Sequence, residues 1–466
     1  MPGRIDATAQ MIDDHATPVA PTLARRLGPF DATMIVMGGI IGAGIFVNPS
    51  VVARQVHTPS LVLGAWIIGG AIALIGAFVY AELAVLRPRV GGQYAYLRDA
   101  YGTPVAFLYG WTLLLVTQTG GMAGAAIIFG RYFRELTGLG VPEQAVAAIT
   151  LALLTIINCM GVRSGSNVQS ALMLTKLAAI ALLIGVGFIL VTPAPDMSSA
   201  AATDSGGALG LATAMVPVLF AYGGWQTASF VSGEMRNPRR DLPRGLLIGV
   251  VGVIVLYLAV TYVCLRTLGV DGLAQTSTPA SEVMRRALGE RGARLIALGI
   301  AISTVGFLSQ SILTAPRVYY AMARDGVFFK AVGTLDPRSR VPVVAIVLQG
   351  VWAAIIALTG KYDQILNYVV SIDVLFFGLT GASLLVFRAR ARRAGTEAGE
   401  GELVRVPWHP FTTLVFVVAC WAVSLTTIVQ YPRNAGIGVA ILLLGLVVYQ
   451  AWRRGAVARA STGVDD

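Results

Sequence analysis

The sequence predicts an all-α integral membrane protein with many spans, and three observations support this fold class. Of its 466 residues, 56% are hydrophobic and only 13% are charged, against about 25% charged residues in an ordinary soluble domain. The mean hydropathy is +0.72. The charged residues gather in short clusters that separate long apolar runs. This composition excludes a disordered chain, a collagen, a small disulfide-bonded scaffold and most soluble enzymes.

The apolar runs predict twelve transmembrane helices, because a bilayer core of about 30 Å requires roughly 20 apolar residues per helix. They are expected at residues 32–53, 61–86, 103–130, 144–162, 168–191, 208–232, 246–269, 293–320, 342–359, 365–388, 411–430 and 435–452. The pattern does not fit a β-barrel, which needs alternating ten-residue strands. The loop between spans 7 and 8, near 270–292, is long enough to hold a short surface helix.

The polar ends of the sequence are expected to be tails. Residues 1–30 predict a disordered cytoplasmic tail and, lacking an apolar run, do not resemble a cleaved signal peptide. Residues 31–453 form one polytopic membrane domain, and 454–466 form a second cytoplasmic tail.

The basic residues indicate how the chain is oriented. With the N-terminus inside, 24 of the 35 Lys and Arg residues fall in inner segments and ten in outer ones. Cytoplasmic loops collect such residues, so both termini are expected in the cytoplasm, with the protein in the cell (inner) membrane. The net charge of +11 follows from this bias and does not indicate nucleic-acid binding. The three cysteines lie in apolar runs and are expected in the core.

Glycines interrupt two of the predicted spans. Span 1 contains Gly38, Gly39, Gly42 and Gly44, and span 6 contains Pro217 followed by Gly223 and Gly224. In span 1 the glycines fit either close helix packing through a GxxxG face or an unwound stretch that lines a cavity. The second interruption, five spans later, favours unwinding at a transporter site and implies an inverted repeat of five spans.

A broken helix has chemistry that suits a zwitterion. Backbone N–H groups are freed at the start of one half-helix, where the dipole also favours a carboxylate. Carbonyl groups are freed at the end of the other half-helix and accept hydrogen bonds from an ammonium group. The two breaks therefore predict a site for an amino acid.

Five motifs resemble the amino acid–polyamine–organocation (APC) transporter superfamily, and within it the L-type amino acid transporter family and its bacterial relatives. They are IIGAGIF at 40–46, LRPRVGGQYAYLRDAYG at 86–102, FAYGGW at 220–225, GEMRNPRRDLPRG at 233–245 and RVYYAMARDG at 317–326. The resemblance implies the LeuT-like (APC) fold with broken helices 1 and 6. In it, 31–191 form the first repeat, 208–388 the second, inverted one, and 411–453 the accessory helices 11 and 12.

The resemblance also implies a substrate site. The substrate carboxylate would meet the backbone at Ala43 and Gly44, beside Gly42, and the amino group would meet carbonyls near Ile40, Ile41 and Phe220. Ala221, Gly223 and Gly224 would shape the side-chain pocket, where glycines leave room for neutral substrates. The family usually has Ser or Thr where Ala43 stands, so here the carboxylate is left to backbone donors.

Lys176 is the one basic residue within a span. It lies nine residues into span 5, roughly 13 Å along the helix, where a Lys costs about 2.5 kcal/mol or more. A snorkelling Lys near the interface is the structural alternative. In the related family a Lys here replaces a bound sodium ion. Its ammonium would bridge span 5 to broken span 1, with Ser303 or Thr304 of span 8 as further partners.

Other residues are candidates for gates. The resemblance makes Phe220 a gate over the substrate, and Trp225 is a candidate for the rim or, alternatively, an interface anchor. Glu82 is expected to pair with Arg87 and Arg89, and Glu234 with Arg236, Arg239 and Arg240, at an inner gate. Asp373 in span 10 is expected to bond within the bundle or to join a proton path. The three histidines are separated, so neither a metal site nor a cofactor is expected.

The sequence thus predicts a permease that moves small to medium neutral L-amino acids by alternating access, without sodium and by exchange (an antiporter), and not an enzyme. The alternative is a proton-coupled importer of amino acids, cationic amino acids or polyamines that uses Lys176. The expected partners are the amino acid and the lipid bilayer, and the oligomeric state stays open. Animal members of the family pair with a glycoprotein through a cysteine in the loop between spans 3 and 4. Residues 131–143 contain no cysteine, so no disulfide-linked partner is expected there.

Overall fold

The computed structural model describes residues 27–87, 91–160, 166–194, 207–337, 339, 341–395 and 404–462, and these residues are almost entirely helical. The helices of the first half are α1 (Pro29–Ile40), α2 (Asn48–Val56), α3 (Pro59–Leu86), α4 (Gln93–Tyr101), α5 (Thr103–Thr112), α6 (Gln118–Thr137), α7 (Glu143–Cys159) and α8 (Ser166–Ile189). Those of the second half are α9 (Gly207–Tyr222), α10 (Thr227–Phe230), α11 (Pro238–Gln275), α12 (Pro279–Thr314), α13 (Pro316–Arg324), α14 (Val343–Thr359), α15 (Tyr362–Ala394), α16 (Phe411–Gln430) and α17 (Pro432–Thr462).

The helices coincide with the predicted apolar runs. Among the described residues, eight helical segments are long and apolar enough to cross a membrane, and four shorter apolar helices stand at predicted spans 1, 4, 6 and 9. Spans 1 and 6 fall in the shorter class because each is interrupted. The structure therefore agrees with a helical membrane protein, whereas the count of twelve spans stays a prediction.

Prolines mark where many of the helices begin. Pro59, Pro238, Pro279 and Pro316 each stand in the first turn of a helix, where a missing N–H leaves no hydrogen bond unmade. The segment between spans 7 and 8 is helical, as expected. There α11 continues past a kink at Gly269 and α12 bends at Gly289, and both glycines have a positive φ.

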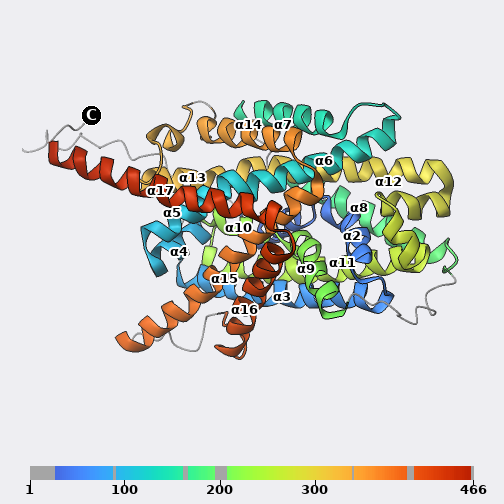
Figure 1. Cartoon of the computed structure of the whole chain (residues 1–466), viewed down its shortest axis with the longest axis horizontal. Helices are drawn as coiled ribbons and strands as arrows, with labels where there is room; N and C mark the ends of the chain where they lie inside the picture. The colour runs from blue at the N-terminus through green and yellow to red at the C-terminus, as the bar shows by residue number, and fades with distance from the viewer. Residues whose placement is uncertain are drawn as a thin grey trace, which may run out of the picture.

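Two groups of helices pack beside each other (Figure 1). One contains α1, α2, α3, α9 and α11, and the other contains α6, α7, α8, α12 and α14. Helices five spans apart touch in four cases: α2 with α9, α3 with α11, α6 with α12, and α7 with α14. An inverted repeat of five spans would produce this pairing, although the repeat itself stays a prediction.

The remaining helices add features that the sequence analysis did not predict. A short helix, α4, lies between spans 2 and 3, and a π-helical turn, η2 (Leu113–Thr117), joins α5 to α6. Helix α15 packs on both α16 and α17. Residues 1–26 of the predicted N-terminal tail lie outside the described residues, whereas α17 extends to Thr462, into the predicted C-terminal tail.

Candidate functional site

The first break separates α1 from α2. The last α-helical bond runs from the Ile41 N–H to the Met37 carbonyl, at 2.7 Å, and a short 3₁₀ turn (Gly44–Phe46) follows before α2 begins. The N–H groups of Ala43, Gly44 and Ile45 have no hydrogen-bond acceptor among the described residues. Consecutive free N–H donors of this kind can accept an anion as a hydrogen-bond partner, and here Ala43 and Ile45 are buried.

The second break follows α9. Gly224 has a φ of +104°, and its N–H donates to Oε1 of Gln226, at 2.9 Å, rather than to the Phe220 carbonyl. The Phe220 carbonyl is therefore left out of the helical hydrogen-bond ladder. The Pro217 carbonyl accepts a hydrogen bond from Nδ2 of Asn48, at 2.8 Å, which ties α9 to α2.

The two breaks touch through glycines. A Cβ atom on Gly39 would lie 2.7 Å from the Gly224 carbonyl oxygen, and one on Gly44 would lie 3.4 Å from Cα of Ala221. The same segment also packs on α12, because a Cβ on Gly42 would lie 3.3 Å from the Phe307 ring. Close packing and unwinding, which the sequence analysis weighed as alternatives, therefore occur together in span 1.

A cavity opens where the breaks meet, and it contains about 850 Å³ of space, open solvent included. Most of the predicted substrate-site residues line it: Ile40, Gly42, Ala43, Gly44, Phe220, Ala221, Gly223 and Gly224. The other walls come from η2, α6, α12 and α15 and include Thr117, Gln118, Phe307, Gln310 and Asp373.

Ile41 of the predicted substrate site and Trp225 of its predicted rim lie away from this lining. Ile41 is buried and contributes only its carbonyl to the neighbourhood of Lys176. Trp225 packs edge-on against Tyr80, with ring centroids 4.6 Å apart, and stacks on Phe377 at 5.3 Å. It borders a second, smaller cavity of about 280 Å³ and belongs to an aromatic core. Phe220 meets the ring of Tyr362 edge-on at 6.2 Å.

Lys176 reaches across to the broken helix. Its side chain is only 2% exposed, and Nζ donates to the carbonyls of Ile41 at 3.0 Å and Gly38 at 3.4 Å. No hydrogen bond joins it to Ser303 or Thr304 in the described part of the chain. The Thr304 hydroxyl donates to the Ile300 carbonyl, and the buried Ser303 hydroxyl has no partner there. A backbone contact of this kind holds α8 to the segment that carries the free donors.

The carbonyl of Ile40 is already saturated. It accepts the Gly42 N–H at 2.8 Å and the Tyr257 hydroxyl at 2.9 Å, so both lone pairs are used. The sequence analysis missed Tyr257, because nothing in its local pattern distinguishes it from other core aromatics. Of the carbonyls expected to accept a substrate ammonium, the one at Phe220 is the least occupied.

The two acidic residues predicted for an inner gate have other partners than those expected. Glu82 binds Arg388 through two hydrogen bonds of 2.7 Å and accepts the Val406 N–H at 2.7 Å. Pairing of Glu82 with Arg87 was wrong because α3 ends at Leu86, and the Arg87 side chain turns toward Asp99, 3.7 Å away. The other expected partner, Arg89, lies outside the described residues.

Glu234 likewise pairs across the fold. Its Oε1 lies 3.3 Å from Nε of Arg317 on α13, whereas the expected partners Arg236, Arg239 and Arg240 are exposed. The expected partners were therefore wrong. The prediction was wrong because the arginines that follow the short 3₁₀ turn (Ser232–Glu234) are exposed. Arg317, from a distant helix, pairs with Glu234 instead.

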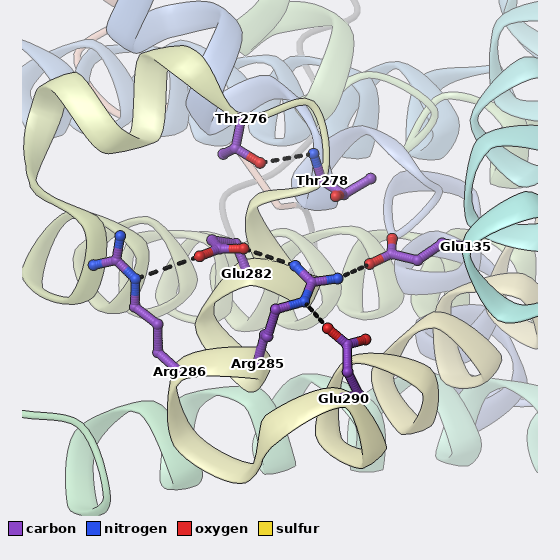
Figure 2. Close-up of polar contacts among 7 residues, drawn as sticks. All are labelled: Glu135, Thr276, Thr278, Glu282, Arg285, Arg286 and Glu290. Atoms are coloured by element: carbon purple, nitrogen blue, oxygen red, sulfur yellow. Dashed lines mark hydrogen bonds and ion pairs between the residues drawn. The ribbon is translucent and has the colours of Figure 1, made fainter. Parts of the chain in front are cut away.

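An ionic network ties the start of α12 to the end of α6 (Figure 2). Arg285 binds Glu282 and Glu290 of its own helix, each at 2.7 Å, and Glu135 of α6 at 2.9 Å. Arg286 adds a longer contact of 3.5 Å to Glu282. This network holds the predicted outer surface helix against the helix that forms one wall of the cavity.

Comparisons with known proteins identify the family of the chain. The family model described as amino acid permease matches residues 27–449. The chain is 28% identical to the serine/threonine exchanger SteT of Bacillus subtilis (strain 168), over 93% of this chain and 98% of that protein. It is 30% identical to large neutral amino acids transporter small subunit 2 of Homo sapiens, over 92% of this chain and 80% of that protein. It is 31% identical to b(0,+)-type amino acid transporter 1 of Homo sapiens, over 80% and 77%.

The family match covers both broken helices, the lysine that contacts the first and every wall of the cavity. Together with the relatives, this match confirms the resemblance to the APC superfamily and its L-type transporters, and it makes the chain a transporter and not an enzyme. The chain belongs to the amino acid permease family.

Proposed function

We propose that this permease exchanges small to medium neutral L-amino acids across the cell membrane, without sodium, by alternating access around the two broken helices. The carboxylate of the amino acid binds the N–H groups of Ala43, Gly44 and Ile45. The α-ammonium binds the Phe220 carbonyl, and the side chain enters the cavity. The single observation that carries the proposal is the run of three free backbone donors at the first break, of which Ala43 and Gly44 line this cavity and Ile45 follows directly behind them.

The energetics of the free donors support a bound anion. A buried backbone group without a partner costs about 1–3 kcal/mol. Ala43 is 1% exposed and Ile45 is fully buried, so their N–H groups gain more from a carboxylate than exposed groups would. The Ala43 side chain has no hydroxyl that could donate a hydrogen bond to the substrate carboxylate. Binding of the carboxylate therefore depends on the backbone conformation at the break.

Lys176 supports independence from sodium. Its ammonium binds two backbone carbonyls of the broken helix, which are the kind of oxygen ligand that a small cation would otherwise use. The Lys176 ammonium thus supplies the positive charge that a bound sodium ion would otherwise supply at these carbonyls. Phe220, in contact with Tyr362, is placed to gate the cavity.

Counterflow in proteoliposomes tests this function. The purified protein is reconstituted into vesicles preloaded with each of the twenty amino acids in turn, in sodium-free buffer at equal pH on both sides. We expect uptake of labelled amino acid to be accelerated by internal neutral amino acids. If no amino acid accelerates uptake, the function is refuted. Uptake that requires an inward proton gradient would instead favour the proton-coupled alternative.

A further inference from the structure

Three buried polar side chains lie just beyond one end of the cavity between the breaks. On α6, Tyr132 follows the lining residue Ile128 by about one helical turn. On α15, Tyr362 precedes the lining residue Val369 by about two turns and stands on the same face of that helix. Asn48 begins α2, directly after the first break. In the predicted topology this is the outer end of the cavity.

Asn48 uses both ends of its side-chain amide. Its Nδ2 donates to the Pro217 carbonyl of α9 at 2.8 Å, and its Oδ1 accepts a hydrogen bond from the Tyr362 hydroxyl of α15, also at 2.8 Å. The Pro217 carbonyl can only accept, so the amide nitrogen must face it and the amide oxygen must face Tyr362. This one buried residue therefore connects α2 to both α9 and α15.

The Tyr362 ring fills the space above the predicted gate. It meets the Phe220 ring edge-on, with centroids 6.2 Å apart, and a Cβ on Gly124 of α6 would lie 3.6 Å from it. Beside it, the Tyr132 hydroxyl donates to the Phe46 carbonyl at 2.9 Å and so joins α6 to the 3₁₀ turn of the first break. These buried contacts cover the cavity at this end.

Both hydrogen bonds run from the broken helices to helices outside their group. Asn48 and Phe46 belong to the segments around the first break, whereas Tyr132 stands on α6 and Tyr362 on α15. Rocking that opens the cavity at this end must separate these partners. The separated groups then bind water instead, so the net contribution of each hydrogen bond is small and the contacts can form again.

We propose that Asn48 and Tyr362 are positioning residues for exchange. Their hydrogen bond, together with the one from Tyr132, closes the predicted outer end of the cavity above Phe220 and must break each time the cavity opens outward. Because Asn48 directly follows the free backbone donors, it connects this closure to the place where the substrate carboxylate binds. The inference rests on the proposed function, because alternating access requires this end of the cavity to open.

Access of a thiol reagent to the cavity from outside tests the closure. A cysteine replaces Ala125, which lines the cavity on α6, and intact cells that express the permease react with a membrane-impermeant maleimide. Protein without the added cysteine gives the background. We expect this cysteine to label about threefold faster or more when Tyr362→Phe is added, because Oδ1 of Asn48 then has no donor in the closed state. Labelling needs no transport, so its result is separate from that of counterflow, which tests the proposed function.

Further variants, each made with the same added cysteine, locate the effect. Tyr368→Phe on α15 is the matched control, because no hydrogen bond joins its hydroxyl to another residue in the described part of the chain. We expect Asn48→Ala to accelerate labelling too, and Asn48→Ala with Tyr362→Phe to label no faster than Asn48→Ala alone, since partners in one hydrogen bond are not additive.

Tyr132→Phe removes the separate contact with the Phe46 carbonyl and is expected to accelerate labelling as well. It provides the test if Tyr362→Phe does not fold. Unchanged labelling in the folded Tyr362→Phe or Tyr132→Phe variant would overturn the inference. Equal acceleration by the control Tyr368→Phe would also overturn it, because the effect would then not depend on the hydrogen bond to Asn48.

Discussion

Gly39 and Gly224 show how single residues set the shape of the site. Each occupies a place where the backbone of the other leaves no room for a side chain, and Gly224 also has a positive φ. Substitution therefore acts on the distance between the two breaks and on the donors beside them. The structure shows that each of these glycines is required by the close approach of the other, which their sequence pattern alone could not show.

Gly39→Ala is expected to lower the exchange rate by about tenfold or more. The new Cβ would lie 2.7 Å from the Gly224 carbonyl oxygen and 2.8 Å from Oγ1 of Thr227, so one backbone segment must move. Overpacking of this kind costs about 1–3 kcal/mol. Gly64→Ala on α3 is the matched control, because no atom lies within 4 Å of its Cβ position. Equal exchange by both variants in vesicles with equal protein content would contradict the expectation.

Lys176→Met is expected to abolish at least nine-tenths of exchange while the protein still folds. The change keeps the length of the side chain but leaves the Gly38 and Ile41 carbonyls without their donor, at a cost of about 1–3 kcal/mol. Lys330→Met, at an exposed lysine, is the control. Initial exchange rates, with size-exclusion profiles to verify folding, measure the effect. Normal exchange by Lys176→Met would show that the ammonium has no role in transport.

Isolated charged residues were the most informative single positions in the sequence. Lys176 stood out because a lysine deep in a span is costly, and its contact with span 1 agrees with the prediction. Asp373 gave the same signal, but its placement in the cavity depends on the rotation of α15, which the sequence did not specify. Tyr257 gave no signal, because its hydrogen bond to Ile40 depends entirely on how α11 packs against α1.

At the scale of elements, interruptions of helices were predicted better than short helices. The glycines and Pro217 located both breaks, since these residues weaken helices in known ways. Helix α4 was missed because it is short and moderately polar and follows two glycines with positive φ. Ion-pair partners were also missed, because Arg388 and Arg317 reach Glu82 and Glu234 from distant helices.

The segment that precedes α16 gives the fold a pH dependence. Nδ1 of His409 lies 2.8 Å from Oγ1 of Thr413, and burial, assisted by Arg388, lowers the pKa of His409 to about 4. The unfolded chain takes up this proton near pH 6.5. The stability contributed by neutral His409 is therefore complete above about pH 6.5 and is lost as the pH falls toward 4.

His409→Asn is expected to reduce the loss of thermal stability between pH 7.5 and pH 4.5. Asparagine does not titrate, so the contribution of His409 to the pH dependence of stability disappears in this variant. Melting temperatures of the detergent-purified protein at the two pH values provide the measurement. His57→Asn is the control, because His57 is exposed and its left-handed conformation suits asparagine. If His409→Asn and wild type lose equal stability, His409 does not cause the effect.

At the scale of the whole molecule, two groups of helices surround one cavity, and the broken helices of one group face α6 and α12 of the other. Such an arrangement suits rocking of one group against the other around a fixed site. The Arg285 network links α12 to α6 within one group, and the Glu82–Arg388 pair links α3 to α15. Composition alone indicated the membrane, but only the packing of the helices placed the cavity between the groups.

A structure of the permease with a bound amino acid tests the proposed site most directly. We expect the substrate carboxylate within hydrogen-bond distance of the N–H groups of Ala43, Gly44 and Ile45, with its side chain in the cavity that Asp373 borders. An amino acid bound elsewhere, such as in the smaller cavity beside Trp225, with the three donors left free, would contradict this assignment.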